Sequence, residues 1–207
     1  MDFGFSEENE RFRAAIRSFI ADHVTPEILQ EMRDGTAGAG IGPLTRELIL
    51  KIGERGWIGM SWPKEYGGQD ADIIDQYIFE EEFARARVPL NLGNFIEQAP
   101  AIMQAGTEAQ KAYFLPRLVR GEVTFALGYT EPSGGTDLAS LKTRAVEDED
   151  GFVINGQKVF TTRAESSSHI YLMARTDPDA SKHKGISIFL VPMDTPGITV
   201  RPLWTLP

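Results

Sequence analysis

Hydrophobic residues change their spacing near Gly121, from a helical period to the alternation that is typical of strands. Before this glycine, apolar side chains recur three or four positions apart, as in the runs Phe12–Ile20 and Leu44–Ile52. After it, apolar and polar residues alternate in short runs that are separated by turn-forming residues. The pattern predicts an α+β protein, with an N-terminal α-helical domain over residues 1–121 and an antiparallel β-barrel-like or sandwich domain over residues 122–207.

Short local signals predict where several helices begin and end. Ser6 comes before two glutamates and the first apolar face, so it predicts an N-cap. Pro26 ends or kinks this helix near Val24, and Pro43 fits the first position of a later helix. Thr107–Gln110 matches a capping box, which predicts the start of a further helix.

Two glycine-rich stretches connect these helices. The Gly/Ala-rich stretch Gly35–Gly42 predicts a mobile connection. The stretch Trp57–Gly68 is also rich in aromatic residues, and we expect their rings to pack against neighbouring helices rather than to stack on a ligand. Gly53 and Gly56 are expected to close the helix that precedes it.

Charged residues on the helices suggest solvent-facing surfaces. Arg11, Arg13 and Arg17 are off the apolar face of the first helix, and we expect them to be solvated. The acidic run Glu80–Glu82 is also expected in solvent. Adjacent residues on a helix point in different directions, so these carboxylates make a poor acid/base pair.

Apolar runs in the second part predict strands at Val123–Leu127, Thr143–Val146, Phe152–Ile154, Gln157–Phe160, Ile170–Met173 and Ile186–Val191. Asp150-Gly151 and Asn155-Gly156 are turn signals that would join neighbouring strands into hairpins. Because the helices precede the strands instead of alternating with them, the pattern argues against a Rossmann site.

The loop Tyr129–Asp137 is the strongest candidate for chemistry. Pro132 fixes the backbone, whereas Gly134 and Gly135 permit conformations in which N–H groups can turn toward an anion. Hydroxyl groups and glycines without a lysine fit a phosphate cradle that relies on backbone dipoles. A plain Pro-Gly β-turn between two strands is the alternative interpretation.

Charge and composition exclude several classes of function. A formal net charge of -9 and a pI near 4.9 argue against binding to nucleic acid or to an anionic membrane surface. No apolar run reaches membrane-spanning length, and no signal peptide is evident. The absence of cysteine suits a cytoplasmic protein and removes disulfides and thiolate chemistry. His23, His169 and His183 show no ligand spacing, so we expect no metal site.

Two motifs together resemble a known family. Thr130–Asp137 fits the pattern Thr-Glu-Pro-x-x-Gly-Thr/Ser-Asp, and Asn155–Thr162 fits Asn-Gly-x-Lys-x-aromatic-x-Thr. Linked at this spacing, they are similar to the flavin-binding signature of acyl-CoA dehydrogenases, and Trp62–Gly68 resembles another segment of that family. The likeness runs from the first helix through Pro207 and covers the family's N-terminal helical domain and most of its middle β-domain.

The resemblance implies that FAD binds to the β-domain. The backbones of Leu127 and Tyr129 and the hydroxyl of Thr130 would meet the isoalloxazine edge. Phe160 and Thr162 would cover the other face of the flavin. Phe160 departs from the family's more common tryptophan, so it offers less stacking area and no indole N–H.

The resemblance also implies contacts to phosphate and substrate. Gly135 and Thr136 would hold the pyrophosphate of FAD, and Thr136 would also contact an acyl-CoA thioester held between the β-domain and the helices. The identity of the acyl chain stays open, because polycyclic, branched and straight chains are all compatible with these residues.

The implied reaction is α,β-dehydrogenation of the thioester to the 2-enoyl-CoA. A carboxylate removes the α-proton, the flavin accepts the β-hydrogen as hydride, and an acceptor such as an electron-transfer flavoprotein reoxidises it. The family's base is a glutamate in a second helical domain, which would be C-terminal to Pro207; Glu131 is expected to be structural. No catalytic residue is therefore assigned within this chain, which alone should be inactive.

Other functions remain open. The chain could be a fragment or one member of a homo- or heterotetramer, because the family's C-terminal helices supply much of the tetramer interface. It could instead be a non-catalytic subunit or interaction module of a hetero-oligomeric acyl-CoA dehydrogenase. A related flavin oxidase or monooxygenase would share the β-domain, and the oxygen reactivity of the reduced flavin would distinguish it.

Overall fold

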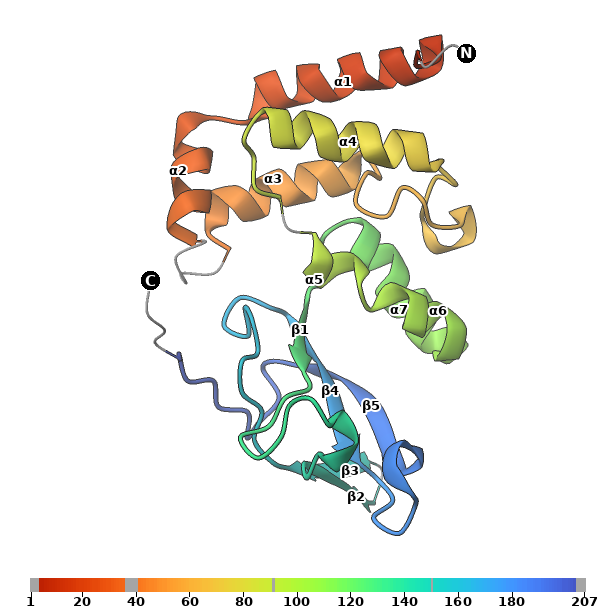
Figure 1. The fold of residues 1–207 in the computed structure, drawn as a ribbon, viewed down its shortest axis with the longest axis vertical. Coiled ribbons are helices and arrows are strands. Elements are labelled where there is room, and N and C mark those ends of the chain that lie inside the picture. Colours follow the sequence, from red (N-terminus) through yellow and green to blue (C-terminus); the bar gives the residue numbers. More distant parts are fainter. Residues whose placement is uncertain (1–3, 36–40, 91, 150, 204–207) are drawn as a thin grey trace. The chain divides into compact units, whose positions relative to one another are not determined.

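The computed structural model describes residues 4–35, 41–90, 92–149 and 151–203. The chain divides into two compact units, Met1–Val123 and Thr124–Pro207. Helices make up the first unit and a β-sheet forms the second (Figure 1). The α+β fold is therefore confirmed, with the helices before the strands.

The helical unit contains α1 (Glu7–His23), α2 (Pro26–Asp34), α3 (Pro43–Glu54), the 3₁₀ turn η2 (Lys64–Tyr66), α4 (Ile73–Arg85), α5 (Gly93–Ile96), α6 (Ala99–Ala105) and α7 (Glu108–Val119). Ser6 and Thr107 cap α1 and α7 through capping boxes, as predicted. Pro43 starts α3, and α1 ends before Val24. Among the described helices, none is long and apolar enough to cross a membrane.

Some helix predictions were incomplete. Pro26 follows the end of α1 and also starts α2, where the Thr25 side chain caps the amide of Ile28; the sequence analysis did not predict this helix. Gly53 is the second-to-last residue of α3, where a Cβ would be 2.3 Å from the Arg120 carbonyl oxygen, and Gly56 follows the end of this helix with a φ of +69°. The predicted connection Gly35–Gly42 falls mainly outside the described residues.

A buried aromatic cluster forms the centre of the helical unit. Trp57 is 7% exposed, and its ring makes edge contacts with Phe12, Phe19 and Phe79 at centroid distances of 5.9, 5.1 and 6.1 Å. The expectation that this tryptophan packs against helices is confirmed.

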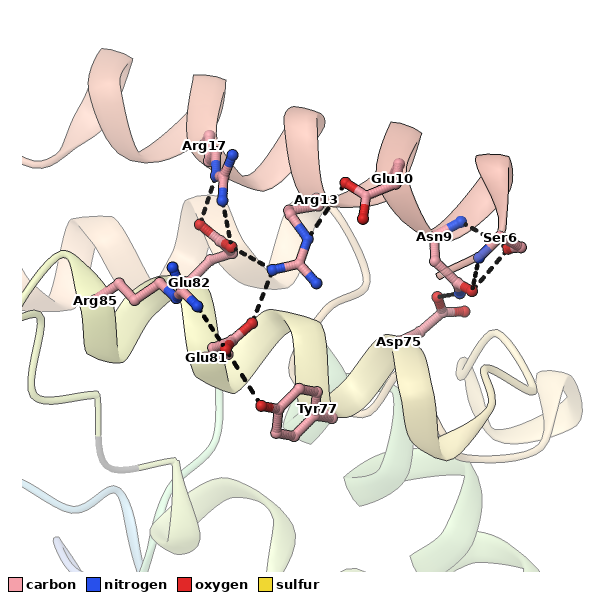
Figure 2. Close-up of polar contacts among 10 residues, drawn as sticks. All are labelled: Ser6, Asn9, Glu10, Arg13, Arg17, Asp75, Tyr77, Glu81, Glu82 and Arg85. Carbon is pink, nitrogen blue, oxygen red and sulfur yellow. Dashed lines mark hydrogen bonds and ion pairs between the residues drawn. The ribbon is translucent and has the colours of Figure 1, made fainter. Parts of the chain in front are cut away.

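An ionic network joins α1 to α4 beside this core. Figure 2 shows Arg13 extending from α1 toward two glutamates of α4, with Nη1 at 2.8 Å from Glu81 and 2.9 Å from Glu82. Arg17 adds bonds of 2.7 and 3.0 Å to the Glu82 carboxylate. Arg85 binds Glu81 from the same helix at 2.9 Å.

This network corrects the prediction that these charges are solvated. The prediction is right for Arg11 and Glu80, which are exposed, but wrong for Arg13 and Glu82, which are 6% and 4% exposed. Arg13 comes three positions before the buried Ile16, and Glu82 comes four after the buried Ile78, so both flank the apolar faces that meet. Hydrogen bonds from Arg17 and then Arg13 outweigh burial and lower the pKa of Glu82.

The second unit contains β1 (Phe125–Gly128), η3 (Leu138–Ser140), β2 (Arg144–Asp148), β3 (Gly151–Asn155), β4 (His169–Arg175), η4 (Lys182–Gly185) and β5 (Ile186–Pro192). The strands form one five-stranded sheet in which β4 is central. One edge of β4 pairs with β5, and the other pairs with β1 and then with β2, whose outer neighbour is β3. The sheet thus brings the ends of β1 and β4 together.

The sheet is mixed, so the prediction of a purely antiparallel sheet was wrong. The pairs β2–β3 and β4–β5 are antiparallel, whereas β4 is parallel to both β1 and β2. Residues 156–168 form no strand, and this connection carries the chain back to the starting end of β1. There, Thr124 and Ser168 exchange two bonds of 2.9 Å. The strand predicted at Gln157–Phe160 is absent from the described sheet, because these residues belong to this connection.

Candidate functional site

Strand β1, which pairs with the central strand β4, leads directly into the candidate loop. Its last residue, Gly128, pairs with Leu172 of β4. A Cβ at Gly128 would be 2.7 Å from Ile170 Cδ1 and 3.0 Å from Leu172 Cδ1, so these side chains pack directly against the glycine and would have to shift for a larger residue. The loop that starts at Tyr129 is therefore anchored on a buried strand.

A tight turn forms the first half of the loop. The amide of Glu131 donates to the Gly134 carbonyl at 3.0 Å, and the Gly134 amide donates back at 3.1 Å. Neither Gly134 nor Gly135 has a positive φ, so the conformational freedom expected of these glycines is not used. Residues 131–134 therefore form a β-turn, and the loop continues from Gly135 to Asp137.

Unpaired amides follow this turn. Within the described residues, the amides of Gly135, Thr136 and Asp137 have no hydrogen-bond acceptor. A Cβ at Gly135 would find its nearest neighbour, Thr130 Cγ2, at 3.6 Å, so the surface there is open. Consecutive exposed N–H groups next to the Thr136 hydroxyl are donors of the kind that bind anions.

The carboxylate of Glu131 points into the protein and holds the loop in place. It accepts bonds from the backbone amides of Lys142 and Thr143 at 2.6 and 2.8 Å. The Lys158 ammonium contacts it at 2.9 Å and also reaches the Tyr129 carbonyl at 3.1 Å. The side chains of Glu131 and Lys158 are only 5% and 7% exposed, so this is a buried ion pair.

These donors determine the charge of Glu131. Burial alone would raise its pKa, but the hydrogen bonds from Thr143, Lys142 and Lys158 outweigh burial and lower the pKa to about 2. The carboxylate is ionised at neutral pH, and its oxygens are occupied. Glu131 is therefore suited to structural anchoring and not to accepting a substrate proton.

The second motif is bound to the first. Besides the ion pair, the Val159 amide donates to the Thr130 carbonyl at 2.9 Å. Phe160 follows with a φ of +58°, and its side chain is 71% exposed. A positive φ is costly for a bulky residue, so the exposed position of this ring is accompanied by backbone strain. Next to it, Thr161 Oγ1 is buried without a hydrogen-bond partner among the described residues.

The residues expected to contact a cofactor differ in exposure. Leu127, Tyr129 and Thr130 are partly buried along and just after β1. The exposed members are Gly135, Thr136, Phe160 and Thr162. The contacts between the two motifs bring these residues to neighbouring segments of one unit, although the motifs are separate in sequence.

Lys158 is a residue whose importance the sequence reasoning missed. It was part of the quoted motif but had no assigned role. The available signal was charge complementarity, since the first motif contains a glutamate and the second a lysine, each as its one long charged side chain.

A hollow of ≈ 500 Å³ is lined by residues of β2 together with Phe152, Thr176 and Ser187. It includes none of the expected contact residues.

Family models match nearly the whole chain. The N-terminal domain of acyl-CoA dehydrogenases matches residues 6–122, and the middle domain of the same family matches residues 126–207. Curated relatives include acyl-CoA dehydrogenases FadE26 and FadE29 of Mycobacterium tuberculosis, at 40% and 43% identity. The matches cover 100% and 98% of this chain but 52% and 51% of those proteins, so the chain spans about half their length.

Solved structures give the same assignment. The Tcur3481-Tcur3483 steroid ACAD matches with a TM-score of 0.83 and 44% identity, covering 100% of this chain and 53% of that chain. The ChsE4-ChsE5 complex from Mycobacterium tuberculosis matches with a TM-score of 0.83 and 39% identity, covering 100% and 52%. With both motifs joined in one unit and both domains matched, this chain belongs to the acyl-CoA dehydrogenase family.

Proposed function

We propose that this chain binds FAD and an acyl-CoA thioester within an enzyme that dehydrogenates the acyl group between its α and β carbons. The observation that carries the proposal is the buried pair of Glu131 and Lys158, which joins the two flavin-type motifs. Their joining presents open amides, a hydroxyl and an apolar ring on neighbouring segments. Membership of the family supports the same reaction class.

The described residues fit FAD. The unpaired amides and hydroxyl at Gly135 and Thr136 would hold its pyrophosphate, and the exposed Phe160 ring would cover its isoalloxazine. The backbones of Leu127 and Tyr129 and the Thr130 hydroxyl would meet the isoalloxazine edge, and Thr162 would join Phe160 in covering the other face. When bound, FAD would accept the β-hydrogen as hydride, while these residues orient it and exclude water.

The α-proton requires a separate base. Glu131 is excluded because its carboxylate is buried, ion-paired and ionised down to a pKa of about 2. We propose that the base is a carboxylate outside residues 1–207, either further along the polypeptide or in a companion chain. This chain would then contribute flavin binding and substrate positioning to a shared active site.

The similar proteins suggest a substrate and partners. One solved relative is titled a steroid ACAD and another is titled a complex of two different chains. We therefore propose a polycyclic, steroid-like acyl-CoA as substrate and a hetero-oligomer as the working form. An electron-transfer flavoprotein would take the electrons, as an external acceptor.

Anaerobic bleaching of flavin absorbance tests the proposal. Residues 1–207 would be supplied with FAD alone, and also together with a companion chain that carries the family's C-terminal helices, before steroid-like and straight-chain acyl-CoA thioesters are added. We expect bleaching only in the assembly. Bleaching by residues 1–207 alone would locate a base within them, and an assembly that retains no FAD would contradict the proposed function.

Thr136→Val is expected to weaken FAD binding by the assembly. The substitution removes one hydroxyl bond to the pyrophosphate, which is worth about 1.5–3 kcal/mol and corresponds to roughly 10- to 150-fold in Kd. Equilibrium dialysis against FAD measures the change. Ser133→Ala removes an exposed hydroxyl from the tip of the same loop and serves as the matched control. Equal dissociation constants for both variants would remove Thr136 from the site.

A further inference from the structure

The guanidinium of Arg175 binds the segment that follows the candidate phosphate loop. Nη2 donates to the Ala139 carbonyl at 2.6 Å, and Nε reaches the Leu141 carbonyl at 3.4 Å. Nη1 donates to the Lys182 carbonyl at 3.2 Å, which connects η4 to the same side chain. Arg175 also uses its backbone amide, at 2.7 Å from the Thr143 carbonyl. One residue at the end of β4 thus binds three carbonyls of the stretch 139–143.

Glu131 binds the same stretch through its amides. The carboxylate takes the N–H groups of Lys142 and Thr143, whereas Arg175 takes the carbonyls of Ala139, Leu141 and Thr143. An arginine and a glutamate therefore divide the donors and acceptors of one short segment between them. Because buried backbone groups need partners, their placement fixes the course of this segment.

We infer that Arg175 is a positioning residue, which holds η3 against β4 and thereby keeps the amides of Gly135 and Thr136 arranged for a pyrophosphate. This inference rests on the proposed function. Each of the three guanidinium nitrogens donates to a backbone carbonyl, so the observed contacts of this side chain are to the segments that flank the loop.

The segment that Arg175 binds follows closely in sequence after the residues proposed to contact the pyrophosphate. η3 begins at Leu138, directly after Asp137, and the Ser140 amide and hydroxyl both return to the Asp137 carbonyl at 3.1 and 2.7 Å. Movement of Ala139 away from β4 would therefore be passed to Asp137 and Thr136. A binding loop that has to be ordered by its ligand loses affinity, because the ordering cost is subtracted from binding.

Arg144 provides a matched control. It is the register partner of Arg175 on β2 and is exposed, and its side chain makes no hydrogen bond or ion pair within the part of the chain that the structure describes. Arg144→Met and Arg175→Met remove the same charge and the same donors from neighbouring positions. Arg175→Lys is a milder variant, since it retains the charge, but its three donors leave a single nitrogen and do not span the separated carbonyls as the guanidinium does.

Two measurements test the inference. Hydrogen exchange of the Ser140 and Leu141 amides, on residues 1–207 without FAD, should be at least 10-fold faster in Arg175→Met and unchanged in Arg144→Met. In the assembly, Arg175→Met should raise the Kd for FAD on the order of 10-fold, as outer-shell partners commonly do. Arg175→Lys should give an intermediate Kd, while urea denaturation checks that the variants remain folded.

The outcomes separate this inference from the proposed function. Unchanged hydrogen exchange in Arg175→Met would show that the side chain does not hold η3. Faster exchange with an unchanged Kd for FAD would show that the position of η3 does not affect FAD binding. Either result overturns the inference. An assembly of wild-type chains that binds no FAD overturns the proposed function and the ligand part of the inference together, and the exchange result still decides whether Arg175 holds η3.

Discussion

Glu131→Ala is expected to lower the free energy of unfolding of the β-unit by about 3–5 kcal/mol, because it leaves Lys158 buried without its partner. The backbone amides of Lys142 and Thr143 lose their acceptor in the same step. Urea denaturation followed by hydrogen exchange of β4 amides measures the change within this unit.

Glu147→Ala is the control for this substitution. Glu147 is exposed on β2, so its loss should change the free energy of unfolding by no more than about 0.5 kcal/mol. Replacing both partners, as in Glu131→Leu with Lys158→Met, should recover part of the loss because no charge is left unpaired. If Glu131→Ala and Glu147→Ala shift the denaturation midpoint equally, the ion pair does not hold the two motifs together.

The same pair gives stability an acid dependence. The folded pKa of Glu131 is about 2, below its usual 4.5, so the folded state favours the ionised form. This contribution is fully present above about pH 4.5 and is lost as pH falls through about 2, below which the carboxylate is protonated in both states. Glu131→Gln should therefore flatten the acid side of the β-unit's stability profile. An unchanged slope between pH 5 and 2 would argue against the low pKa.

Glu82→Ala should strongly destabilise the helical unit. It leaves Arg13 buried with one partner fewer, and breaking such a pair costs about 3–5 kcal/mol. Arg17 is 56% exposed at its side chain, so it can be solvated after the change. Fluorescence of the buried Trp57 during urea denaturation reports the stability of this unit.

Glu80→Ala controls for the loss of a glutamate from α4. Glu80 is exposed and its carboxylate contacts only Gln76 of the same helix, at 3.1 Å, among the described residues. Its removal should cost no more than about 0.5 kcal/mol. A similar midpoint for Glu80→Ala and Glu82→Ala would mean that the network in Figure 2 adds little to the joining of α1 and α4.

Local chemistry explains which parts of the fold could be predicted from sequence. The caps at Ser6 and Thr107 involve residues three positions apart, so both partners are visible in one short window. Arg13 and Glu82 are 69 positions apart, and neither periodicity nor composition pairs them. A charge beside an apolar face looks solvated until the opposing helix is known.

In the candidate site, too, local features could be predicted from the sequence, whereas long-range contacts could not. The motif residues were recognisable, and the presence of a turn with open neighbours could be expected from proline and glycine. The bonds that join the motifs could not, because Lys158 and Arg175 reach partners 27 and 36 positions away. The parallel pairing of β1 with β4 was also hidden, since Asn155-Gly156 resembles a hairpin turn but leads into a connection without a strand.

Glu131 and Lys158 are both held by buried contacts, and these contacts limit where residues can be inserted between them. An insertion in the segment up to Thr143 would displace the amides that Glu131 binds, and one just before Lys158 would pull its ammonium out of reach. The turn between β2 and β3 is different. Its flanking residues Glu149 and Gly151 are exposed, and a Cβ at Gly151 would have no neighbour within 4 Å. Extra residues, or a fused peptide tag, would therefore be accommodated at this turn without moving either motif.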